Sequence, residues 1–134
     1  VALGNGMANL ARNLWASSII LCGHFTEHTQ TFTEEECENE SRGHWYYRQM
    51  LGSSNFDGNR LLHIMSGHLS YQIEHHLFPD IPAHRYAEIS PQVREICERH
   101  GLHYNTASFA KQYGSVIKRV LKFSLPSSLR KLTA

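Results

Sequence analysis

The sequence predicts an all-α fold, and three stretches support that prediction. In residues 61–77, which contain no proline, apolar residues recur at spacings of three and four, as they do on one face of a helix. Ser90-Pro91 offers an N-cap followed by proline, and Gly101 would end that second helix. A third helix, with Asn105 or Thr106 as its cap, would carry an apolar stripe made of Phe109, Tyr113, Val116, Ile117, Val120 and Leu121.

The N-terminal stretch predicts a further helix, followed by a long loop. Residues 7–23 are mostly apolar or small, but Arg12 interrupts them, and the uncharged run 13–23 is too short to cross a bilayer alone. The end of a membrane helix and a buried helix of a soluble protein suit this stretch equally. Because the chain starts at Val1 without Met or a signal sequence, we expect an upstream part to be missing. Glycines and an acidic run in residues 26–59 predict a loop with short interfacial pieces.

Composition excludes some classes and points to one residue type. The chain has 13 Lys and Arg residues and 12 Asp and Glu residues, so its net charge does not favour binding to nucleic acid. Three scattered cysteines without a CxxC pair indicate neither a disulfide framework nor a thiolate zinc site. Ten histidines in 134 residues are a large excess, and histidine is the commonest metal ligand.

Four nitrogen-bearing side chains fall on one face of the helix expected at 61–77. His68, Gln72, His75 and His76 would lie within an arc of about 100°. The adjacent pair His75 and His76 would point about 100° apart, which suits two metal ions better than one. Glu74, Asp80 or a carboxylate from the missing upstream part is expected to hold the second ring nitrogens. A dinuclear metal site is therefore predicted.

The remaining histidines carry less information. His24 and His28 have a spacing of four, which would bring both rings to one side of a helix, next to the end of the apolar run. Five others lack partners on a shared helical face and are interpreted as ordinary polar residues: His44, His63, His84, His100 and His103.

The run 66–79, SGHLSYQIEHHLFP, resembles the third histidine box of membrane fatty acid desaturases, (H/Q)xxHH followed by LFP. Ile81-Pro82-Ala83-His84-Arg85-Tyr86 is similar to the segment that follows this box. Cys22-Gly23-His24-Phe25 and Tyr104-Asn105-Thr106 resemble bacterial acyl desaturases of the actinobacterial type. The acidic insert 33–41 has no counterpart in the resemblance.

The resemblance implies the C-terminal part of a helical membrane desaturase. Residues 1–24 would be the end of a membrane helix, 25–60 a loop, and 61–134 cytoplasmic helices. His75 and His76 would be catalytic iron ligands, and Gln72 would occupy a position that is histidine in many relatives. His24 or His28 would match an additional ligand, with the two earlier histidine boxes outside this chain.

The implied activity is oxygen-dependent insertion of a cis double bond at two non-haem iron ions. Its substrate would be acyl-CoA or an acyl-lipid, with electrons from a ferredoxin, cytochrome b5 or flavin reductase, and no nucleic-acid partner. The basic helix 108–124 would lie on the anionic inner leaflet and contact membrane lipid. Related hydroxylases, epoxidases or other histidine-box oxygenases are the alternative, and a structural zinc site lacks the usual thiolate or carboxylate pattern.

Overall fold

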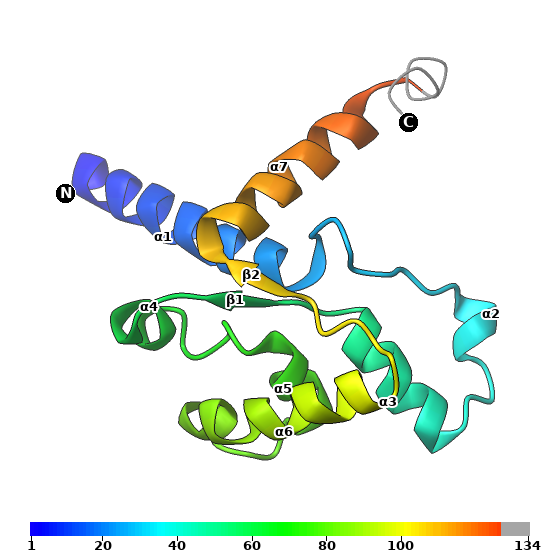
Figure 1. Cartoon of the computed structure of the whole chain (residues 1–134). Coiled ribbons are helices and arrows are strands. Elements are labelled where there is room, and N and C mark those ends of the chain that lie inside the picture. Colours follow the sequence, from blue (N-terminus) through cyan, green and yellow to red (C-terminus); the bar gives the residue numbers. More distant parts are fainter. Residues whose placement is uncertain (127–134) are drawn as a thin grey trace.

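The computed structural model describes residues 1–126, which form mostly helices and one short pair of strands (Figure 1). In chain order the elements are α1 (Ala2–His24), α2 (Glu34–Cys37), α3 (Arg42–Leu51), β1 (Asn55–Asp57), α4 (Arg60–Met65), α5 (Gln72–Leu77), the 3-10 turn η1 (Ala83–Arg85), α6 (Tyr86–Arg99), β2 (Thr106–Ser108) and α7 (Phe109–Ser124). The predicted helical character is confirmed. Within these residues, none of the helices combines the length and the apolar character that crossing a membrane requires.

The strand β1 lies at the centre of the described structure. It pairs in parallel with β2, with Phe56 opposite Ala107. Just before it, the Ser54 amide donates to the Gly23 carbonyl of α1 at 2.9 Å, and the Phe56 amide donates to the Ser70 carbonyl at 3.0 Å. The sequence did not predict these strands, because three residues are too few for an alternating pattern. They join α1, α7 and the turn before α5.

Two apolar clusters hold the helices around this pair. Ile19, Cys22, Phe56 and Val116 pack where α1, β1 and α7 meet. Ile73, Leu77, Val93 and Cys97 pack between α5 and α6, with Met50 of α3 against them. In Figure 1, α7 crosses α1 on one side of the strands, while α3, α5 and α6 lie on the other. The end of α1 and the start of α5 therefore approach each other beside β1.

The expected continuous helix over 61–77 is wrong. The chain forms two six-residue helices, α4 and α5, separated by a turn in which Gly67 and His68 have φ values of 62° and 60°. A glycine adopts this left-handed conformation without steric cost, and two such residues in succession reverse the chain. His68 consequently lies outside the helix that carries Gln72, His75 and His76.

Two other boundaries differ from the sequence prediction. Helix α6 begins at Tyr86 and contains Pro91, while the Ser90 hydroxyl lies 2.9 Å from the Tyr104 hydroxyl and caps nothing. Helix α7 is capped by Ser108, not by Asn105 or Thr106. The Ser90-Pro91 pair is typical of a helix start, but here Ser90 lies inside the helix and its hydroxyl contacts Tyr104 instead of a backbone amide.

The predicted loop 26–59 contains two helices. In the acidic insert, Thr33 and Glu36 form a capping box that begins α2. The Glu40 carboxylate pairs with the Arg48 guanidinium of α3 at 2.6 Å. Glu36 and Glu40 thus have local structural contacts, and α3 packs against α5.

Candidate metal centre

Three nitrogen-bearing side chains meet where the end of α1 faces α5. The Nε2 atom of His24 lies 3.2 Å from Nε2 of Gln72 and 3.4 Å from Nε2 of His76. The rings of His24 and His76 are almost perpendicular, with centroids 4.9 Å apart. His24 is the last residue of α1, and Gln72 begins α5. Three of the residues singled out in the sequence therefore come together from positions about 50 residues apart.

A glycine permits this close approach. Gly23 is buried, and a Cβ atom built there would lie 2.9 Å from Cγ of Gln72. Real Cβ contacts are essentially never that short. The absence of a side chain at Gly23 thus lets the amide of Gln72 reach the ring of His24.

The environment of His76 leaves one ring nitrogen available to a cation. Its Nδ1 atom lies 2.8 Å from the Oε1 atom of Gln49, which accepts the Nδ1 proton, so Nε2 carries a lone pair. Burial, followed by the neighbouring His24 and His75, lowers the pKa of His76 to about 4. The ring is therefore neutral at neutral pH, as metal binding requires.

The lone pairs of two imidazoles converge in this cluster. The amide nitrogen of Gln72 donates to Nε2 of His24, so this ring nitrogen of His24 is an acceptor. Nε2 of His76 is an acceptor too, because its proton is on Nδ1. Two acceptors 3.4 Å apart repel unless a proton or a metal ion lies near both. Imidazole nitrogen suits iron, zinc and copper alike, so this donor set fits a transition metal without selecting one.

His75 points away from its neighbour, as adjacency on a helix predicts. The two rings are 5.7 Å apart and nearly perpendicular, and Nδ1 of His75 lies 3.1 Å from the buried Tyr86 hydroxyl. His75 and His76 thus face different positions, which suits ligands to two different metal ions.

Glu74 does not hold either histidine. Its side chain is fully buried, with Oε1 accepting from the Tyr104 hydroxyl at 2.6 Å and Oε2 from the Asn55 amide at 2.8 Å. Burial raises the pKa of this carboxyl group. The Asn55 Oδ1 atom also accepts from the Ile73 amide at 2.9 Å. This network fixes α5 to β1 and to the segment before β2.

The partners of the histidine rings are therefore different from those expected. Gln49 and Tyr86 occupy the positions beside Nδ1 that the sequence suggested for Glu74 or Asp80. Gln49 was missed because it lies in a region predicted to be loop. Tyr86 lies inside the segment similar to desaturases, but nothing in its spacing signalled a contact with His75.

Among the described residues, two predicted ligand candidates make no hydrogen bond or ring contact with this cluster. His68 sits in the turn between α4 and α5, and its Nδ1 atom is buried without a hydrogen-bond partner. His28 does not share a helical face with His24, because α1 ends at His24, and its ring instead lies 5.4 Å from that of His103. Over residues 1–126, no three His, Cys, Asp or Glu side chains are grouped to hold a metal ion.

Comparison with known proteins identifies a family. The profile described as "Fatty acid desaturase" matches residues 1–108. The NADPH-dependent stearoyl-CoA 9-desaturase of Mycobacterium tuberculosis is 49% identical over 122 residues, which cover 91% of this chain and 29% of that protein. Human fatty acid desaturase 3 is 33% identical over 88 residues, covering 66% of this chain and 20% of that protein. No solved structure matches this chain significantly.

Proposed function

Because this chain belongs to the fatty acid desaturase family, we propose that the protein is a membrane-bound desaturase that introduces a cis double bond into a fatty acyl chain. The chain spans less than a third of the length of the mycobacterial relative. The activity is therefore proposed for the whole protein, of which these residues supply one part of the metal site.

The converging ring nitrogens of His24 and His76 are the observation that carries the proposal. We assign these two side chains, with Gln72 beside them, to one iron ion and His75 to the other. Further ligands would come from parts of the protein outside this chain. The bound iron pair would supply the activation of dioxygen and the removal of two hydrogens from adjacent methylene groups.

The other residues of the site act on the histidine rings. The Gln49 oxygen keeps the proton of His76 on Nδ1, and the Tyr86 hydroxyl orients His75. The contacts of Glu74 with Asn55 and Tyr104 hold α5 in place, so that both rings are positioned before a metal ion binds. His28 and His68 are not assigned as ligands, because neither reaches this cluster.

The proposed substrate follows the name of one relative, and the proposed electron carrier follows the family resemblance. The mycobacterial relative is named as acting on stearoyl-CoA with NADPH, so a long-chain acyl-CoA is the substrate we propose. Its electrons would arrive through a reduced carrier protein, such as a ferredoxin, cytochrome b5 or flavin reductase. The apolar α1 would belong to the membrane-associated part of the full-length protein, with the rest of this chain on the cytoplasmic side.

Replacing single histidines in the full-length protein tests the proposal. His75→Ala or His76→Ala should each abolish desaturation and lower the iron content per protein, because each removes a ligand nitrogen. His100→Ala is the control, since His100 is exposed at the end of α6 and away from the cluster. Unchanged iron content and activity in His76→Ala would exclude the assigned site, and a hydroxylated product would indicate an oxygenase of another type.

A further inference from the structure

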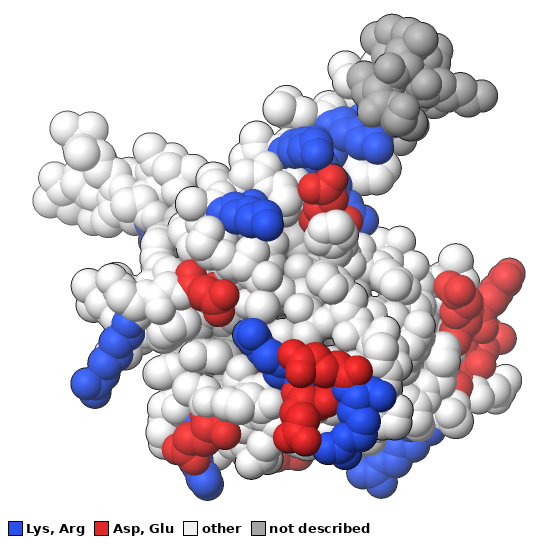
Figure 2. Space-filling view, in the orientation of Figure 1, with Lys and Arg blue, Asp and Glu red and all other residues white. Residues whose placement is uncertain are grey.

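A second group of basic side chains surrounds a cleft on the exposed side of α7. The cleft has a volume of about 290 Å³, and its lining includes Lys111, Ser115 and Lys118 of α7, His28 from the segment after α1, and His103 from the segment before β2. Figure 2 shows blue side chains gathered over α7 on this face, with an acidic group among them. Four nitrogen-bearing side chains from three segments thus border one space, while the Ser115 hydroxyl beside them donates to the Gln112 carbonyl.

The helix geometry brings the two lysines together. Residues seven apart on an α-helix differ by about 20° around its axis, so Lys111 and Lys118 lie on the same face. Ser115 lies between them, and its Oγ atom accepts from the Glu27 amide at 3.3 Å. That contact fixes the segment after α1 against α7. The rings of His28 and His103 meet edge to face, with centroids 5.4 Å apart.

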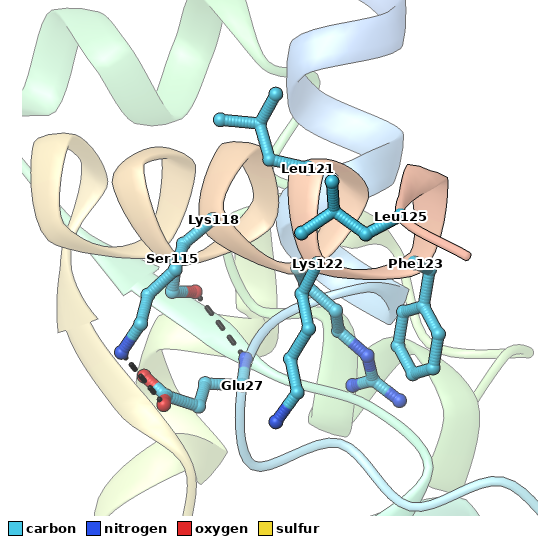
Figure 3. A pocket seen from close by; sticks show the side chains of 8 residues that line it. Glu27, Ser115, Lys118, Leu121, Lys122, Phe123 and Leu125 are labelled. Carbon is cyan, nitrogen blue, oxygen red and sulfur yellow. Dashed lines mark hydrogen bonds and ion pairs between the residues drawn. The ribbon is translucent and has the colours of Figure 1, made fainter. Parts of the chain in front are cut away.

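Glu27 supplies a carboxylate at the edge of this cleft. Its Oε1 atom lies 3.2 Å from Nζ of Lys118, and both side chains are largely exposed (Figure 3). The ammonium group of Lys118 lowers the pKa of Glu27 through its hydrogen bond and its positive charge. An exposed pair of this kind contributes little to stability, so an incoming anion can compete with Glu27 for Lys118.

We infer that this cleft binds a phosphate group. The lining of this cleft includes two lysines and two histidines but one carboxylate, that of Glu27, which leaves an excess of donors and one net positive charge. A phosphate oxygen accepts charge-assisted hydrogen bonds from such donors. His28 then serves as an anion ligand instead of a metal ligand.

The phosphate has two chemical sources in this setting. One is the coenzyme A part of an acyl-CoA substrate, a source that rests on the proposed function, and the other is the headgroup of an anionic phospholipid. An adjoining cavity of about 630 Å³ also contains Lys122, which points to the same side of α7 as Glu27 (Figure 3). A ligand with several phosphates could therefore extend from one cavity into the next.

The test is equilibrium binding of free coenzyme A to the iron-free full-length protein in neutral detergent. Lys111→Ala and Lys118→Ala should each weaken binding about tenfold, the effect of losing one charge-assisted hydrogen bond. Glu27→Gln should instead tighten binding, because it removes the competing carboxylate. Arg60→Ala is the charge-matched control, since Arg60 belongs to α4 and not to the cleft.

A parallel measurement with vesicles of phosphatidylglycerol, compared with phosphatidylcholine, distinguishes the two sources. Loss of preference for phosphatidylglycerol in the lysine variants, with coenzyme A binding unaffected, would support the phosphate site and assign it to lipid. Equal affinities for both probes across all four variants would overturn the inference. Because binding needs neither iron nor turnover, this result is independent of the outcome for His75→Ala and His76→Ala.

Discussion

At the scale of single residues, neutral side chains hold the histidine cluster in place. Gln49 and Tyr86 contact the Nδ1 atoms of His76 and His75, while the carboxylate of Glu74 turns away from both. The resemblance to desaturases suggested His24 or His28 as a ligand beside His75 and His76, and in the structure it is His24 that lies next to His76. The sequence could not indicate their supporting residues, because Gln49 and Tyr86 contact the rings through tertiary packing that no local pattern encodes.

Gly23 is the residue whose replacement most directly tests this packing. Gly23→Ala should destabilise the protein by about 1–3 kcal/mol and displace Gln72 from His24, because the added Cβ overpacks the contact with Gln72. Gly6→Ala, in the same helix and with no atom within 4 Å of the added Cβ, should not destabilise it. Thermal unfolding of the two variants is the measurement. Equal melting temperatures would contradict the close contact between residue 23 and the Gln72 side chain.

At the scale of the elements, the turn between α4 and α5 separates what the sequence could predict from what it could not. The helical periodicity of residues 61–77 is real on both sides of the turn, and Gln72, His75 and His76 do share one helix. The break follows from the left-handed conformations of Gly67 and His68. A non-glycine residue with positive φ is uncommon, so no pattern in the sequence predicts one at His68.

The anchoring of α5 depends on a hydroxyl group contributed by a distant segment. Tyr104→Phe should destabilise the protein by about 1–3 kcal/mol, since it leaves the buried Glu74 carboxylate without one of its donors. It should also lower the affinity for iron, because α5 carries His75 and His76.

Tyr113→Phe is the matched control for that experiment. It removes a hydroxyl that has no hydrogen bond among the described residues, from a ring stacked on Phe109. Chemical denaturation and iron titration of both variants provide the measurements. Wild-type iron affinity in Tyr104→Phe would show that the network stabilises the fold without positioning the histidines.

At the scale of the whole molecule, α7 is buried against the protein in its first half and exposed in its second half. The sequence predicted one apolar stripe lying on a membrane surface, and for the first half of the helix this is wrong. Val116 is fully buried beside Ile19 and Phe56, and Phe109 and Tyr113 pack against the same cluster. Further along, Ile117 and Leu121 remain 44% and 62% exposed. Helical periodicity identifies an apolar face but not the surface that covers it.

This division of α7 predicts opposite behaviour for two aliphatic residues five positions apart. Val116→Ala should lower the free energy of unfolding by about 2 kcal/mol, because it removes two methyl groups from a site with no exposed surface. Leu121→Ala should change stability by less than about 0.5 kcal/mol. If the exposed half of α7 contacts lipid, Leu121→Ala should instead weaken binding of the helix to anionic vesicles, since apolar burial contributes to that affinity. Denaturation and vesicle co-sedimentation of the same two variants separate these effects. A large loss of stability in Leu121→Ala would place this residue in a protein core that the described residues do not form.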